Sequence, residues 1–127
     1  MKTITSNIIN KNILRINKEE TLVLFKIDKI LIELAPIKSD FRIIHLAYLI
    51  DYPPENISKL LKKIYGKNFN QIVNLYRLAY MEKLIFQEVF NKKKINISEL
   101  IKQAGFNSRN SYYVTLKASN ELNINTL

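Results

Sequence analysis

The chain has 127 residues, enough for one domain with a substantial hydrophobic core. It contains no cysteine and one histidine, His45, which excludes disulfides, thiolate nucleophiles, zinc–thiolate sites and histidine-rich metal sites. The formal net charge of +9 indicates an anionic partner, with nucleic acid first, although AT-rich coding sequence also produces basic chains rich in Ile, Lys and Asn.

Hydropathy and helix-breaking residues indicate the fold class. No apolar run reaches the ~18 to 20 residues that cross a bilayer, and the first residues lack the order of a signal peptide. We therefore expect a cytoplasmic protein that does not bind membranes.

The chain has only two glycines and three prolines, and this scarcity favours long helices over hairpins and sheets. The expected fold is all-α.

Residues 1–35 are expected to form an N-terminal helical extension of one or two helices. A first short helix would carry Ile8, Ile9, Ile13, Leu14 and Ile16. Asn17 lies three residues before Glu20, which is typical of a capped helix start, and this second helix should end before Pro36. The side chains expected on its buried face are Leu22, Phe25, Ile30, Leu31 and Leu34. A pair of strands over residues 21–34 is the alternative, but no tight-turn dipeptide separates them.

Residues 41–65 predict a short helix, a tight turn and a basic helix. Ser39 or Asp40 can cap the short helix, which should cover residues 41–50. Its expected buried side chains are Ile44, Ala47 and Tyr48. The turn should follow before Pro53, because the residue that precedes a proline is pushed out of the helical region.

The basic helix of this unit should start at Pro54 and stop at Gly66. Proline is favoured in the first turn of a helix, and glycine is favoured at the left-handed position after its end. Apolar side chains recur on one face and lysines on the other: Ile57, Leu60, Leu61 and Ile64 against Lys59, Lys62 and Lys63. The two helices make a first helix-turn-helix candidate over residues 41–65.

Residues 69–90 predict one long helix. Their apolar positions include Phe69, Ile72, Val73, Tyr76, Ala79, Leu84 and Val89. The lysine run at residues 92–94 ends the pattern, and it is either a solvated hinge or a phosphate clamp. The long helix would therefore act as a spine between the first unit and the residues that follow.

A second helix-turn-helix candidate covers residues 98–118. Ser98 can cap a short helix that ends at Gly105, and Asn107 or Ser108 can cap a final helix. The side chains of the final helix that we expect in the core are Tyr112 and Leu116. The predicted architecture is thus two helix-turn-helix units joined by a long helix.

The landmark residues of these units occur in a set order along residues 36–120. In the first unit they are Leu46, Ala47, Pro53, Pro54, the run Ile57-Ser58-Lys59-Leu60-Leu61-Lys62-Lys63, Gly66, Phe69, Arg77, Leu78 and Ala79. In the second unit they are residues 97–106, which end in Gly105 and Phe106, followed by Tyr112, Leu116 and Lys117. With this order and spacing, the chain resembles the DNA-binding region of the AraC family of bacterial transcription regulators.

The resemblance implies an AraC-like DNA-binding domain over residues 36–127. Such a protein would be a sequence-specific transcription regulator of double-stranded DNA, located at the nucleoid, with two recognition helices in successive major grooves ~34 Å apart. A monomer can read a nonpalindromic site in this way, while a dimer and a contact with RNA polymerase remain open. No cofactor, metal or enzymatic activity is expected, because no paired carboxylates, nucleophile–base pair or phosphate loop can be assembled.

The sequence departs from the family pattern in three places, and the last two favour an alternative function. Ile101 and Ala104 exchange the expected small and large residues, which can preserve volume where two helices cross. Val114 stands where a DNA-facing polar residue is usual, and residues 121–124 replace a closing Gly-x-x-Pro motif. The alternative is therefore a decayed helix-turn-helix module that acts through protein–protein interaction.

Nine residues are candidates for DNA contact. A recognition helix presents its first residues to base edges, and the residues that follow lie nearer phosphates. The base-edge candidates are Glu55, Asn56, Lys59, Ser108, Arg109 and Asn110, with Arg109 the best placed for a guanine. The phosphate candidates are Lys62, Lys63 and Lys117. A solvated helix face is the alternative for the charged residues, whereas Arg77 is expected to hold the long helix in place.

Overall fold

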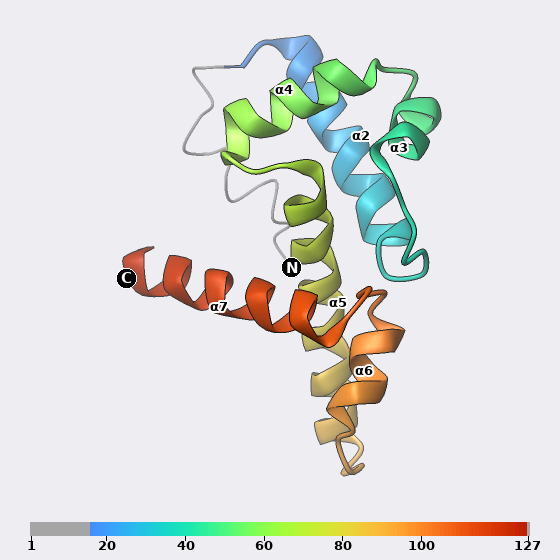
Figure 1. Ribbon diagram of the computed structural model, residues 1–127, viewed down its shortest axis with the longest axis vertical. Helices are drawn as coiled ribbons and strands as arrows, with labels where there is room; N and C mark the ends of the chain where they lie inside the picture. Colours follow the sequence, from blue (N-terminus) through green and yellow to red (C-terminus); the bar gives the residue numbers. More distant parts are fainter. Residues whose placement is uncertain (1–15, 127) are drawn as a thin grey trace.

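The computed structural model describes residues 16–126, with side chains over residues 16–120, and within these residues the fold is all-α. Its helices are α2 (Lys18–Leu34), α3 (Ile43–Ile50), α4 (Pro54–Tyr65), α5 (Phe69–Phe90), α6 (Ile97–Gln103) and α7 (Arg109–Thr126) (Figure 1). The predicted all-α class is confirmed, and the strand alternative for residues 21–34 is wrong. The first short helix, expected around Ile8 to Leu14, lies outside the described residues.

Helix α5 runs along the long axis of the molecule, and the other helices pack around its two halves (Figure 1). Its first half closes one hydrophobic cluster with α2, α3 and α4. Its second half closes another with α6 and α7. The largest fully buried side chains of the first cluster are Leu24, Ile27, Leu31, Leu46, Ile57, Leu61, Ile72 and Val73, and Met81 is the largest in the second. The helix expected in an N-terminal extension thus supplies part of the first core.

Helix α2 begins with the capping box expected at Asn17. The Asn17 Oδ1 accepts a hydrogen bond from the Glu20 backbone N at 2.8 Å, and the Asn17 backbone N donates to Glu20 Oε1 at 3.2 Å. The predicted buried face is partly wrong, because Leu22 and Phe25 are exposed. The buried residues are Val23, Leu24, Ile27, Asp28 and Leu31. Helix α2 carries apolar side chains on both its predicted and its observed buried face, so its packing against α3 and α5 decides which face is covered.

Helix α3 starts two residues later than expected, and neither Ser39 nor Asp40 caps it. The N-cap is Arg42, whose backbone N donates to His45 Nδ1 at 3.1 Å. Phe41 is not helical, and its ring is buried in the first cluster instead. Of the side chains expected inside, Ala47 is buried, whereas Ile44 is 62% exposed and Tyr48 is 86% exposed. Leu46 and Ile50 take their places in the core.

Helices α4 and α5 have the predicted bounds. Pro54 occupies the first turn of α4, and Gly66 ends the helix in the left-handed conformation with a φ of 68°. All four expected inner side chains of α4 are buried, namely Ile57, Leu60, Leu61 and Ile64. Helix α5 starts with a second capping box, in which the Asn68 and Gln71 side chains each accept a backbone hydrogen bond at 2.9 Å.

Helix α6 begins at Ile97, and its cap is Asn96 rather than Ser98. The Asn96 Oδ1 accepts from the Glu99 backbone N at 3.1 Å, which satisfies an N–H of the first turn. Ser108 caps α7 in the same way, since its Oγ accepts from the Ser111 backbone N at 3.1 Å. Helix α7 continues to Thr126, beyond the expected end near residue 118.

The loop of residues 35–39, between α2 and α3, joins the two halves of the molecule. Arg77 is buried beneath it, as expected of a residue that holds the long helix in place. Its Nε donates to the Ala35 carbonyl at 2.9 Å, and its Nη2 donates to the carbonyls of Lys38 and Ser39 at 2.8 and 3.3 Å. Burial lowers the pKa of the Arg77 guanidinium, but arginine stays charged at neutral pH.

Gly105 contacts the same loop from the second half of the chain. Its φ of 89° lies in the region that favours glycine. A Cβ at this position would lie 2.6 Å from the carbonyl oxygens of Ala35 and Pro36. Only a residue without a side chain therefore lets the turn between α6 and α7 approach the 35–39 loop this closely.

Candidate nucleic-acid interface

The outer face of α4 carries the five candidates from the first unit. Four apolar side chains fix the inner face of this helix in the first cluster, so the remaining positions point to solvent. The exposed candidates are Glu55, Asn56, Lys59, Lys62 and Lys63. The first three lie in the first two turns, and the two lysines lie in the last turn. The structure thus brings the predicted base-edge and phosphate candidates of α4 together on one surface.

Lys63 is the candidate whose charge already has a partner. Its Nζ lies 3.2 Å from Glu20 Oε1, and this ion pair joins α4 to the first turn of α2. An exposed pair of this kind contributes little stability, about 0 to 1 kcal/mol, but the Glu20 carboxylate offsets the attraction of Lys63 for an anion. Lys59 and Lys62 are the more effective cations of α4.

The first turn of α7 carries the candidates from the second unit. Arg109 and Asn110 are exposed there, and Lys117 is exposed two turns further on. The Ser108 hydroxyl is engaged at the helix cap, where it also lies 3.0 Å from Ser111 Oγ. Its role in this structure is therefore to start the helix, which leaves Arg109 and Asn110 as the presented side chains.

The inner face of α7 is held by aromatic packing. Tyr112 is buried, and its ring meets Phe106 edge to face at a centroid distance of 5.6 Å. Tyr113 follows at 4.9 Å from Tyr112, but it is exposed. Val114 is 59% exposed, at the position where a polar side chain would be usual for DNA contact. Arg109 is thus presented beside an apolar patch on the same helix.

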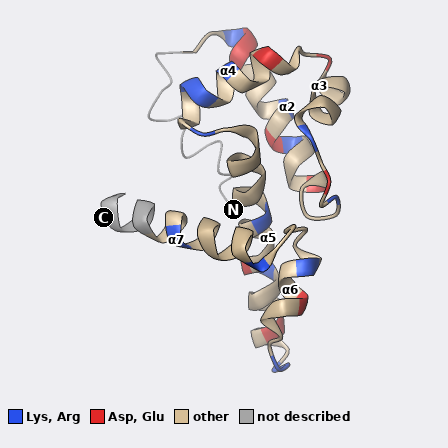
Figure 2. Cartoon of the chain, viewed as in Figure 1, with Lys and Arg blue, Asp and Glu red and all other residues tan. Residues whose placement is uncertain are grey.

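In Figure 1, α4 lies across the upper end of the molecule, above the start of α5, and α7 crosses the middle of α5 and extends to the left. In Figure 2, lysines and arginines occur on α4, on the connection between α4 and α5, and on α7. No acidic residue occurs between residues 56 and 75 or between residues 100 and 120. These two segments cover most of α4, the start of α5 and most of the described side chains of α7. They carry basic side chains and no carboxylates.

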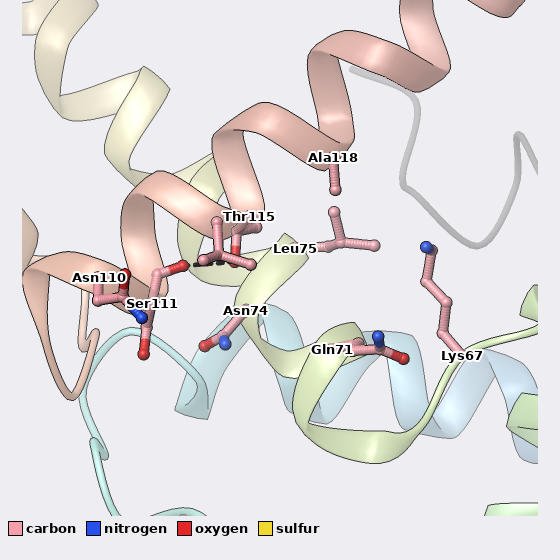
Figure 3. A pocket seen from close by; sticks show the side chains of 9 residues that line it. Lys67, Gln71, Asn74, Leu75, Asn110, Ser111, Thr115 and Ala118 are labelled. Atoms are coloured by element: carbon pink, nitrogen blue, oxygen red, sulfur yellow. Dashed lines mark hydrogen bonds between the residues drawn. The ribbon is translucent and has the colours of Figure 1, made fainter.

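A groove separates α7 from the first half of α5. Its volume is about 220 Å³, and it opens to solvent. The lining residues are Lys67, Gln71, Asn74, Leu75, Asn110, Ser111, Val114, Thr115 and Ala118 (Figure 3). Sequence reasoning found Asn110 but missed the α5 wall. The signal was present, because Gln71 and Asn74 recur at helical spacing opposite the buried face of α5 and Lys67 shortly precedes that helix.

No family model, curated protein or solved structure matches the chain. The candidate interface therefore rests on the geometry of this chain alone. Among residues 16–126, no group of three His, Asp or Glu side chains could hold a metal ion. None of the described helices has the length and apolar character that a membrane span requires.

Proposed function

We propose that the protein is a sequence-specific regulator of transcription that binds double-stranded DNA. In this proposal, α3 with α4 and α6 with α7 are two helix-turn-helix units of the AraC type, and α4 and α7 enter successive major grooves. The observation that carries the proposal is that each half of a single spine helix packs a helix pair whose second helix, α4 or α7, has exposed basic side chains. The chain would act as a monomer at the nucleoid, in the cytoplasm.

The connections within each helix pair support this interpretation. The first pair turns at Asp51, with a φ of 52°, and the second turns at Gly105, with a φ of 89°. A left-handed residue after the first helix gives the sharp turn that places the second helix across it. The inner faces of α4 and α7 are buried, so their outer faces are free to lie in a groove that admits one helix.

The side chains at the start of each helix suit base recognition. Asn56 can form two hydrogen bonds with adenine, and Arg109 can form two with guanine. Lys59 follows one turn after Asn56 on the exposed face of α4. Lys62 and Lys117 lie further along their helices, where they would bind phosphates and fix the register on the duplex.

A selection experiment tests the proposal. Duplexes that the full chain retains from a random pool should share a motif, and they should bind more tightly than unselected duplexes in a gel-shift titration at physiological salt. Specific affinities of proteins that read bases exceed their nonspecific ones by ~10³-fold or more. Equal affinity for selected and random duplexes would remove sequence-specific regulation as the function.

Exposed apolar side chains on α7 favour a second candidate function. Tyr113 and Val114 are 48% and 59% exposed, with Val114 beside the groove against α5, and a partner protein could cover both. In this alternative, the second helix pair is a decayed unit that binds protein. A pull-down from nuclease-treated extract, with loss of the partner on changing Val114→Asp, would support it if the chain also failed to select any duplex.

A further inference from the structure

We propose that the groove between α5 and α7 binds a phosphate of the DNA strand that passes between the two major grooves. This inference rests on the proposed function and adds a third contact region to it. The groove lies between the end of α4 and the start of α7, because Lys67 follows α4 directly and Asn110 lies in the first turn of α7. In the proposed complex, a duplex that touches both helices would pass over this position.

The amide groups of the groove are oriented to donate hydrogen bonds. The Gln71 Oε1 is occupied, since it accepts from the Asn68 backbone N at 2.9 Å. The Asn74 Oδ1 accepts from Arg77 Nη1 at 3.2 Å. A backbone N–H and a guanidinium can only donate, so both contacts fix the amide oxygen toward the protein. Each side chain therefore has its NH₂ group left for a ligand that accepts.

The remaining polar groups complement an anion. Lys67 is half-buried, and its ammonium group ends above the wall that Gln71 and Asn74 form (Figure 3). Asn110 extends from the opposite wall, on α7. No aspartate or glutamate lines the groove. Lysine and amide side chains are common partners of phosphate oxygens in protein–DNA complexes, so a phosphodiester suits this lining.

The size of the groove also suits this occupant. Its 220 Å³ is several times the ~30 Å³ that one water molecule occupies in the liquid, so a phosphate group can enter with part of its sugar. Apolar side chains also line the groove, among them Leu75 and Ala118. They can pack against a deoxyribose while the donors beside them hold the phosphate oxygens.

Two isosteric substitutions test the site without disturbing the fold. Gln71→Glu keeps an oxygen for the Asn68 N–H, and Asn74→Asp keeps one for Arg77, but both remove the donating NH₂ group. The double variant should bind the selected duplex at least tenfold more weakly than the wild type. A control with the same added charge is Gln87→Glu with Gln103→Glu, since both side chains are exposed outside the groove. Circular dichroism melting checks that all three proteins are folded.

Neutral phosphates locate the contact on the DNA. Replacing the phosphates of the selected duplex one at a time by methylphosphonates should weaken wild-type binding at a position between the two grooves. At that position, the methylphosphonate should not weaken the binding of the Gln71→Glu, Asn74→Asp variant any further. The slope of log K against log salt should also fall by about 0.9 for each phosphate contact that is lost.

The outcomes separate this inference from the proposed function. A wild-type protein that selects a duplex, with groove variants that bind as tightly as the charge-matched control, would leave the regulator standing and overturn the groove site. Failure of the wild type to prefer any duplex would overturn both. Equal losses in the groove variant and the control would also overturn the inference, because added negative charge alone would then explain the effect.

Discussion

Gly105 is the residue on which the relation between the two halves of the molecule depends most directly. We expect Gly105→Ala to destabilise the protein by at least about 2 kcal/mol, because a left-handed alanine costs about 1 to 3 kcal/mol and its Cβ would overlap two carbonyl oxygens. Urea denaturation followed by circular dichroism measures the change.

Gly66 provides the control for this substitution. It has a similar backbone conformation, with a φ of 68°, but nothing lies within 4 Å of a Cβ added there. Gly66→Ala should therefore cost only the backbone strain, about 1 kcal/mol. Equal losses for the two alanines would show that the contact between Gly105 and the 35–39 loop contributes nothing to stability.

Arg109 is the residue whose removal tests base recognition. We expect Arg109→Ala to weaken binding to the selected duplex by about 1 to 3 kcal/mol while nonspecific binding changes little, if its guanidinium reads a base. Fluorescence anisotropy with selected and random duplexes measures both affinities. Lys29→Ala removes one charge from an exposed position on α2 and should leave the ratio of the two affinities unchanged. An unaltered ratio in Arg109→Ala would assign Arg109 to the solvated surface.

At the level of helices, local signals in the sequence were sufficient where they were unambiguous. Pro54 and Gly66 mark the ends of α4, and these bounds agree with the structure. Helix α3 has seven apolar side chains and one histidine in eight residues, so several stripes look equally suited to the core. Its buried face is decided by contacts with α2 and α4, which no pattern within α3 encodes.

The start of α6 gives a test of helix capping. Asn96→Ala should destabilise the protein by about 0.5 to 2 kcal/mol, because the Glu99 backbone N–H then loses its acceptor. Ser98→Ala should have almost no effect, since Ser98 is exposed within the first turn and is not the cap. Thermal melts of the two variants decide between the predicted and the observed helix start, and a larger loss for Ser98→Ala would contradict the capping by Asn96.

The candidate interface shows the same division between local and distant information. The exposed residues of α4 could be named from the sequence because this helix has a clear apolar face to set them against, and those of α7 because they lie at its start. The α5 wall of the groove was missed, because its role depends on where α7 crosses α5. That crossing is fixed by packing between segments about thirty residues apart, at Leu78 and Met81 of α5 and Tyr112 of α7.

At the scale of the whole molecule, the 35–39 loop ties the two hydrophobic clusters together. Arg77 bonds to this loop from α5, and Gly105 contacts it from the second helix pair. The loop is thus held by residues from both halves. If α4 and α7 both bind DNA, the distance between the two helices is set by the protein. It cannot adjust to a DNA site with a different spacing.

The spacing of the DNA site tests this rigidity. Inserting five base pairs between the two contacted grooves turns them to opposite faces of the duplex, since one helical turn is about 10.5 base pairs. We expect affinity to fall to that of a duplex with only one groove intact, as measured by gel shift. An insertion of ten base pairs should not restore binding, because a single chain cannot lengthen. Unchanged affinity after the five-pair insertion would mean that only one helix pair contacts DNA.

The unbroken course of α5 through both clusters also limits how this sequence can change over time. One residue added near its middle would rotate the second half of the molecule by about 100° and shift it by about 1.5 Å. The Gly105 turn would then no longer meet the 35–39 loop. The exposed lysines at residues 92–94 follow the end of α5. A residue added there leaves the parts of α5 that pack in the two hydrophobic clusters unchanged. Homologous chains should therefore differ along α5 by substitution alone, and differ in length at this turn.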